Sequence, residues 1–162
     1  MTTPIDRHQP ARAIRSRIAL PGVAPANALL LMSDETRLSE WMSEASQPRG
    51  GELIELTVDP TAGGVVRIIE RLGGRLFTHT GVVTASDEQS ISVNVMCDMG
   101  PVHLVSVGID ATVRSDGAGG SILEIRQTLL AREHELLNAA QLWWAAAAQS
   151  LRRVAALTAA AG

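Results

Sequence analysis

The sequence predicts an α+β fold in which seven antiparallel strands form one curved sheet around a long C-terminal helix. Three observations support this prediction. Residues 52–129 alternate apolar and polar side chains in short runs separated by turn residues, as in antiparallel strands. The alanine-rich segment Glu133–Ala160 has apolar residues three and four positions apart, as in an amphipathic helix. A helix that follows a run of strands must bury its apolar face against their sheet, and a cavity commonly lies between such layers.

The first strand is expected at Ala11–Leu20, after a flexible polar tail over residues 1–10. Apolar residues alternate with arginines in this segment, so one face of the strand should be buried and the other wet. Residues 11–160 are then expected to form one domain, because a chain of 162 residues has an ordinary size for a single domain.

Two short helices are expected between the first and second strands. Pro25 can begin a helix over Ala26–Met32, because proline at the first helical position loses no intrahelical hydrogen bond. Ser33 can then cap a second helix whose first turn carries Asp34 and Glu35, where the helix dipole favours carboxylates.

The other six strands are placed by their alternation and by the turn residues between them. They are expected at Leu53–Val58, Val65–Glu70, Leu76–Ala85, Ser90–Asp98, Val102–Arg114 and Ser121–Leu129. Glycine, proline and aspartate between these segments supply the chemistry of tight turns. The glycine pairs therefore predict hairpin turns and not phosphate-binding loops, since none is followed by Lys-Ser or Lys-Thr at the start of a helix.

The final helix presents one apolar stripe to the predicted sheet. The stripe consists of Leu137, Ala140, Trp144, Ala147, Leu151, Val154 and Thr158. Neighbouring helical positions differ by about 100°, so Trp143 and Trp144 should straddle the stripe, one in the core and one beside a pocket or a subunit contact. Leu142 lies near the polar side and suggests a modest exposed patch and a possible homodimer.

Composition excludes several classes of function. A net charge of −3 and an aromatic content of 2% do not favour nucleic acid as a partner, since neither a basic surface nor stacking platforms are provided. No segment approaches the roughly 18 consecutive apolar residues of a membrane span, and no secretory leader is expected. Cys97 is the single cysteine, which agrees with a reducing cytoplasm.

Candidate polar sites are few. His79 and His103 lie within predicted strands and could face the cavity, where they would orient a polar head group or, alternatively, serve as hydrogen-bonded structural residues. Cys97 has no histidine or basic residue near it in the sequence and is expected to be a small buried hydrophobe. Glu55 and Glu70 fall mid-strand and are expected on the wet convex face. No CxxC, HxH or HExxH spacing occurs, so we expect neither a metal site nor a cofactor.

Several local segments resemble one superfamily. They are Ser33-Asp34-Glu35, Glu40-Trp41-Met42, Gly50-Gly51 and Gly81-Val82-Val83, together with Trp144 and Leu151 in the closing helix. Their order resembles that of START-like (SRPBCC, Bet v 1-like) proteins, and the branch is similar to the activator of Hsp90 ATPase. The resemblance covers about residues 11–157 and implies a helix-grip fold. Trp143 replaces a glycine of that pattern, and the region usually rich in aromatic residues holds only Phe77, which implies an aliphatic pocket.

The leading hypothesis is non-enzymatic binding of a small hydrophobic ligand between the sheet and the C-terminal helix. The residues expected to line the site are Phe77, His79, His103, Val105, Val107, Ile109, Trp144, Ala147 and Leu151. The resemblance also allows a chaperone-associated interaction protein, or a polyketide cyclase or hydrolase that uses a cavity histidine. A filled interior would favour the interaction protein, an open apolar cavity would favour binding, and two titratable groups converging on the cavity would favour catalysis.

Overall fold

The computed structural model describes residues 12–98, 104–129 and 134–160 and contains one antiparallel sheet. Its seven strands follow the order β1-β7-β6-β5-β4-β3-β2. The elements are β1 (Arg12–Leu20), α1 (Pro25–Ser33), α2 (Glu35–Ser46), η1 (Gln47–Arg49), β2 (Gly51–Val58), β3 (Val65–Leu72), β4 (Arg75–Ser86), β5 (Ser90–Asp98), β6 (Leu104–Ser115), β7 (Ser121–Leu129) and α3 (His134–Ala160).

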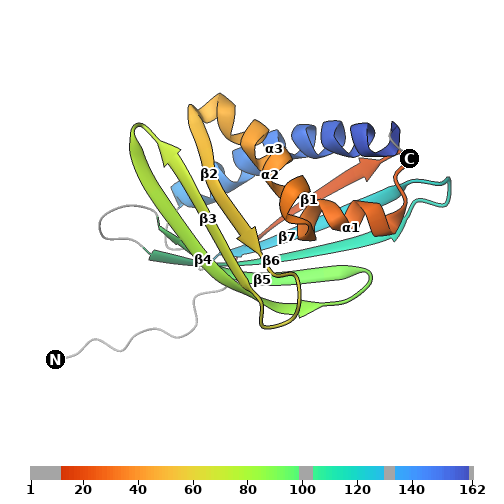
Figure 1. Ribbon diagram of the computed structural model, residues 1–162, viewed down its shortest axis with the longest axis horizontal. Helices are drawn as coiled ribbons and strands as arrows, with labels where there is room; N and C mark the ends of the chain where they lie inside the picture. Colours follow the sequence, from red (N-terminus) through yellow and green to blue (C-terminus); the bar gives the residue numbers. More distant parts are fainter. Residues whose placement is uncertain (1–11, 99–103, 130–133, 161–162) are drawn as a thin grey trace.

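The sheet curls around α3, and the short helices α1 and α2 lie on the same side of it (Figure 1). The predicted α+β helix-grip is therefore confirmed, including the pair of short helices after the first strand. None of the helices within the described ranges combines the length and apolar character that crossing a membrane requires.

The junction between α1 and α2 differs from the prediction by one residue. The cap of α2 is Asp34, whose carboxylate accepts a hydrogen bond from the backbone N–H of Arg37 at 3.1 Å. Ser33 instead ends α1, and its hydroxyl donates to the Leu29 carbonyl at 3.0 Å. The prediction of Ser33 as the cap was wrong because the serine hydroxyl is satisfied within the preceding helix.

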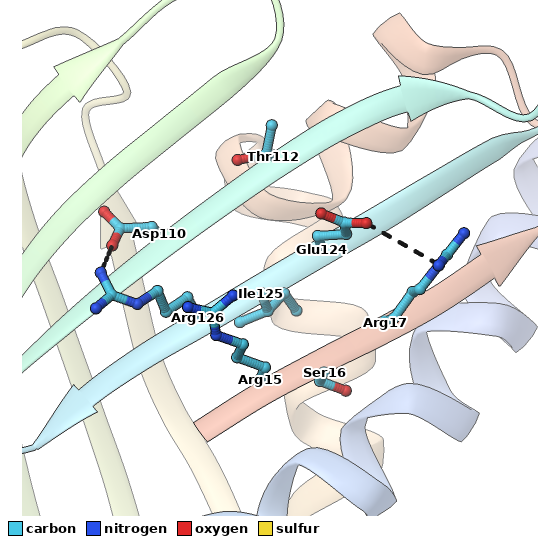
Figure 2. Close-up of a pocket in the computed structure, with 8 residues that line it drawn as sticks. All are labelled: Arg15, Ser16, Arg17, Asp110, Thr112, Glu124, Ile125 and Arg126. Atoms are coloured by element: carbon cyan, nitrogen blue, oxygen red, sulfur yellow. Dashed lines mark ion pairs between the residues drawn. The ribbon is translucent and has the colours of Figure 1, made fainter. Parts of the chain in front are cut away.

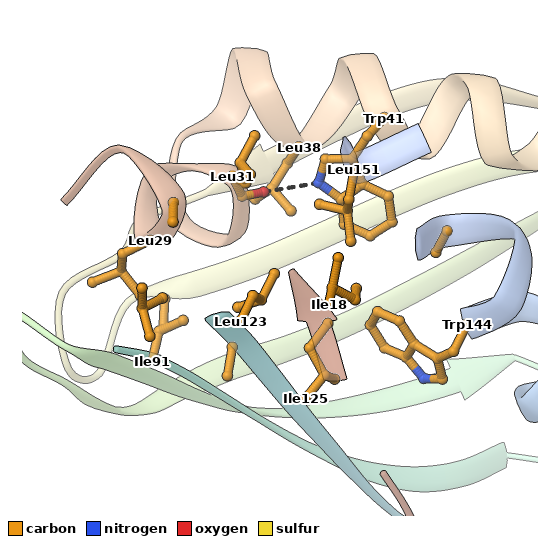
Figure 3. Close-up of a cluster of buried hydrophobic side chains, with 14 of the residues drawn as sticks. Ile18, Leu29, Leu31, Leu38, Trp41, Ile91, Leu123, Ile125, Trp144 and Leu151 are labelled. Atoms are coloured by element: carbon orange, nitrogen blue, oxygen red, sulfur yellow. Dashed lines mark hydrogen bonds between the residues drawn. The ribbon is translucent and has the colours of Figure 1, made fainter. Parts of the chain in front are cut away.

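Trp41 holds α1 and α2 together. Its indole N–H donates to the carbonyl of Leu31 at 2.8 Å, and the residue is 2% exposed. Leu31 lies in the last turn of α1, where carbonyl groups have no partner within the helix. One side chain thus satisfies a helix end and fills the core beneath both helices (Figure 3).

The core lies between the concave face of the sheet and the C-terminal half of α3. Ile18, Leu123 and Leu151 have no exposed surface and belong to the same cluster of buried residues (Figure 3). The alternation expected in the first strand is present, since Ile14 and Ile18 are buried while Arg15 and Arg17 are exposed. The apolar stripe of the helix is buried from Trp144 to Val154, as its spacing predicted.

Gly81 permits a close approach of β4 to β5. A Cβ atom at this position would lie 2.2 Å from the carbonyl oxygen of Asn94 and 2.9 Å from the Cα of Val95. Both contacts are with backbone, which cannot move aside as a flexible side chain does. The register between the two strands also shifts between Val83 and Ala85, so the sheet bends in this region.

Gly81→Ala is expected to lower the free energy of unfolding by about 1–3 kcal/mol, because an added methyl group forces the two strands apart. Gly108→Ala is the matched control, since a Cβ there meets only side-chain atoms at 3.4 Å and 3.8 Å. The control should change stability by no more than about 0.5 kcal/mol. Urea unfolding followed by tryptophan fluorescence measures both, and equal losses would contradict the close approach.

Candidate functional site

A cavity of about 220 Å³ lies between the N-terminal half of α3 and the concave face of the sheet. Its lining residues are Met42, Arg49, Ile68, Glu70, His79, Val95, Cys97, Val105, Val107, Ile109, Gln127, Leu129, Ala139, Ala140, Trp143 and Trp144. They come from α2, η1, α3 and five consecutive strands of the sheet, β3 to β7. The site is therefore assembled from positions spread across most of the chain.

On α3, the cavity is bounded by two alanines and by Trp143 and Trp144. Ala139 and Ala140 face the opening, whereas Leu151 and Val154 fill the corresponding space further along the helix. Trp144 lies at the boundary, since it is 4% exposed yet lines the cavity.

Three tryptophans surround this boundary. The ring of Trp41 lies 6.4 Å from the rings of both Trp143 and Trp144, within the range of favourable aromatic pairs. Both tryptophans of α3 line the cavity, while Trp144 is the more deeply buried of the two. Straddling the apolar stripe thus brings both rings to the same space.

The polar end of the cavity is a charged network centred on Glu70. One carboxylate oxygen accepts a hydrogen bond from the Arg49 guanidinium at 3.1 Å, and the other lies 3.1 Å from Nε2 of His79. The guanidinium of Arg49 also lies 4.6 Å from the centre of the Trp143 ring, which is a cation–π contact. A half-buried carboxylate is tolerated here because two donors compensate for its lost hydration.

Both ring nitrogens of His79 have partners. Nε2 contacts Glu70, and Nδ1 lies 3.2 Å from the backbone N–H of Asp98, which donates to it. The Asp98 bond requires a lone pair on Nδ1 and so favours a neutral ring, whereas the carboxylate favours a charged one. Burial also opposes the charge, but contacts with the Cys97 sulfur and the Glu70 carboxylate outweigh it and raise the pKa of His79 to about 9.

The pKa of Glu70 is lowered, chiefly by its hydrogen bond with His79. Burial opposes this shift and the positive charge of Arg49 supports it.

Glu70 was expected on the wet face, and that prediction was wrong. β3 contains adjacent apolar residues, Val65 with Val66 and Ile68 with Ile69, so its sequence is compatible with burial of either face. Pairing with β4 decides which face of the sheet Glu70 occupies. Glu55 is exposed as expected and pairs with Arg67 at 3.3 Å.

Cys97 also differs from its predicted surroundings. Thr80 pairs with Met96 across β4 and β5, which brings the next residues along these strands, His79 and Cys97, beside each other on the concave face. The cysteine was expected to be buried with no histidine near it, but it is half-buried and a histidine is its neighbour. Distance along the sequence concealed this contact, because antiparallel pairing creates it.

The cavity includes five of the residues named from the sequence: His79, Val105, Val107, Ile109 and Trp144. Ala147 and Leu151 are fully buried in the packed core and do not line it. Phe77 is half-buried on β4, with the Arg75 guanidinium 5.0 Å from its ring, and lies outside the lining. His103 lies outside the described residues.

Sequence reasoning missed Arg49, Glu70 and Gln127 as lining residues. A signal for two of them was present, because each interrupts an apolar phase of its strand. Gln127 follows Leu123 and Ile125 at alternate positions, and Glu70 follows Val66 and Ile68 in the same way. A polar residue in a buried phase indicates a site where a polar partner is available.

A second hollow lies on the opposite, convex face of the sheet (Figure 2). Its volume is larger, about 380 Å³, but its lining is mostly exposed and charged: Arg15, Ser16, Arg17, Asp110, Thr112, Glu124, Ile125 and Arg126. Cross-strand ion pairs, such as Arg126 with Asp110 at 3.9 Å, neutralise much of this charge. Such exposed pairs are typical of a solvated sheet face. Within the described ranges, no group of three or more His, Cys, Asp or Glu residues is placed to hold a metal ion.

Comparison with solved structures finds the same architecture. A protein from Rhodobacter sphaeroides superposes with a TM-score of 0.72 at 19% identity, over 90% of this chain and 92% of its own. Ara h 8.0201 gives a TM-score of 0.69 at 10% identity, over 90% and 98% of the two chains. The Aha1 dimer from Colwellia psychrerythraea gives 0.65 at 12% identity, over 87% and 93%.

The chain has a Bet v 1-like helix-grip fold. Proteins similar in structure to it include an Aha1 protein, so the likeness of fold that the sequence suggested is confirmed. No protein-family model matches the sequence, and no curated protein matches it. At these identities the shared property is the Bet v 1-like architecture, and the chemistry of the cavity depends on its own side chains.

His79 is expected to titrate with a pKa near 9, well above the ordinary histidine value of 6.5. Because the folded value is the higher one, its stabilising contribution should be fully present below about pH 6.5 and lost as pH rises through about 9. NMR titration of the histidine ring nitrogens measures this pKa. Glu70→Gln should lower it, whereas Glu55→Gln on the exposed face should leave it unchanged. A His79 pKa at or below 6.5 in the unmodified protein would contradict the expected charge and show that burial and the Asp98 N–H keep the ring neutral.

Proposed function

We propose that this protein binds a small, largely apolar molecule in the cavity between α3 and the sheet, without transforming it chemically. The observation that carries the proposal is the cavity itself, a space of about 220 Å³ walled mainly by Val, Ile, Leu, Ala and Trp side chains. Filling such a space with apolar ligand surface contributes roughly 25 cal/mol per Å² removed from water. A likeness to Bet v 1-like proteins, whose fold binds hydrophobic ligands, supports the same assignment.

The volume limits the size of the ligand. Pockets that enclose drug-sized molecules measure roughly 300–1,000 Å³, and this cavity is smaller. The proposed ligand is therefore of the size of one or two fused rings or a short chain. Large sterols and multi-ring polyketides would have to project beyond the opening.

The proposed site orients its ligand through its polar end. Arg49 lies at this end and is held by Glu70 and by the Trp143 ring. Its guanidinium has five N–H donors, of which the bond to Glu70 uses one. We assign Arg49 and His79 to the region that a polar head group of the ligand would approach, and Val105, Val107, Ile109 and Trp144 to the apolar wall.

One observation favours catalysis as a second candidate, because the titratable groups Glu70 and His79 do converge on the cavity. Their hydrogen bonds argue for the binding function instead. Nε2 and Nδ1 of His79 are both engaged, and so are both oxygens of Glu70. A general base needs a free lone pair and a pKa near the working pH. The lone pair of His79 Nδ1 is engaged by the Asp98 N–H, and the lowered pKa of Glu70 makes its carboxylate a weak base.

A homodimer is a further part of the proposal. Leu142 is 73% exposed on the outer side of α3, and one protein of similar structure is an Aha1 dimer. Sedimentation measurements on the unmodified protein and on Leu142→Glu would test it. A monomer at all concentrations would count against a dimer and leave the cavity assignment untouched.

Native mass spectra of the purified protein are expected to show a discrete added mass that disappears on denaturation. Ala140→Leu should reduce the bound fraction at least about fivefold, because a branched side chain would occupy the cavity. Ala145→Leu, on the exposed face of the same helix, is the matched control and should bind as the unmodified protein does.

The released compound should be recovered chemically unchanged after prolonged incubation with fresh protein, whereas a product would support the catalytic candidate. Bare protein that stays bare with tetralin, 2-tetralone and decanoate would count against ligand binding.

A further inference from the structure

Gln127 is a buried polar residue in an apolar part of the cavity wall. It is 9% exposed and lines the cavity from β7. Its cross-strand neighbours are Ile14 on β1 and Ile109 on β6. Ile125 and Leu129 precede and follow it on the same face of its own strand. No charged residue is among these four neighbours, so Gln127 stands apart from the network around Glu70.

A hydrogen bond from Trp144 fixes the orientation of the Gln127 amide. The indole N–H of Trp144 donates to Oε1 of Gln127. An indole nitrogen can only donate, so the atom that receives this bond must be the amide oxygen and not the nitrogen. The oxygen therefore has a partner, and the two N–H donors of the amide remain.

These two donors have no hydrogen-bond acceptor among the described residues. In the described part of the chain, a nitrogen of Arg37 is the one side-chain atom that is both sealed from solvent and without a partner. The Gln127 nitrogen also has no partner but is not such an atom, so it retains some accessible surface. The space that Gln127 lines is the cavity. An amide donor that faces an apolar space without a partner costs about 1–3 kcal/mol, which an acceptor placed there would recover.

We propose that Gln127 donates a hydrogen bond to a carbonyl oxygen of the ligand, so that the cavity selects small apolar ketones, esters or lactones over hydrocarbons of the same shape. This inference rests on the proposed binding function and names the class of ligand.

Comparison of the groups that could accept this hydrogen bond favours a neutral carbonyl. The amide oxygen already accepts the Trp144 bond, whereas neither N–H donor has a partner among the described residues, so the group that a ligand most needs to supply is an acceptor. A hydroxyl group could accept as well, but its own hydrogen would then need an acceptor among isoleucines, where Gln127 Oε1 already accepts from Trp144. A carboxylate would lose its hydration in exchange for one neutral donor, and that exchange is unfavourable in an apolar site. A carbonyl oxygen has two lone pairs and no hydrogen, which matches what the amide supplies.

The test compares two ligands of one shape. 2-Tetralone carries a carbonyl group, and 2-methylidenetetralin replaces its oxygen by a methylene group. The ratio of their dissociation constants is measured by calorimetry for the unmodified protein and for Gln127→Met, which keeps the unbranched chain and removes the donors. The substitution should shift this ratio against the ketone by roughly 3- to 10-fold, the value of one hydrogen bond. Binding of the methylidene compound shows that the variant still has its cavity.

A second measurement uses the unmodified protein, in case Gln127→Met unfolds because Trp144 loses its acceptor. The side-chain NH₂ resonances of Gln127 should move in ¹⁵N spectra when 2-tetralone is added and stay in place with the methylidene compound. If both ligands bind with the same ratio in protein and variant, or move the resonances equally, the role of Gln127 is overturned while ligand binding stands. If neither ligand binds to the unmodified protein, the proposed function fails with it.

Discussion

The packing of Trp144 divides the interior of this protein. Its indole ring lies beside Trp41, and its N–H group bonds to Gln127 on the opposite wall. Toward the C-terminus of α3, Ala147 and Leu151 pack fully into the core. Toward the N-terminus, Ala139 and Ala140 line the cavity. One side chain therefore closes the core and forms a boundary of the cavity, so stability and binding both depend on it.

The two polar regions of the cavity differ in how far their hydrogen-bonding groups have partners within the protein. Glu70 is surrounded by donors, and its charge is compensated by Arg49 and His79 within the protein. Gln127 is compensated on its oxygen alone. Buried polar groups are retained in apolar surroundings only when they have partners. The carboxylate of Glu70 is thus satisfied within the protein, whereas the N–H groups of the Gln127 amide have no partner among the described residues.

This protein shares its fold with solved structures whose sequences are very different from its own. The proteins that superpose on this chain share between 10% and 19% of its residues in the comparisons described above. Curvature of the sheet and the place of the long helix recur, because strand alternation and one amphipathic helix suffice to specify them. The side chains that face the cavity are not specified in this way, so each such protein can present a different surface to a ligand.

Periodicity within the sequence determined the strands, the three α-helices and the buried face of β1, because the alternation of residues such as Ile14 and Ile18 is a local property. It also placed Val105, Val107 and Ile109 on the side of the sheet that faces the helix. Only the tertiary structure decided which face Glu70 occupies, that His79 lies beside Cys97, and that Ala140 borders empty space while Ala147 does not. Those features arise from strand register and from the distance between helix and sheet, which depend on contacts between residues far apart in the chain.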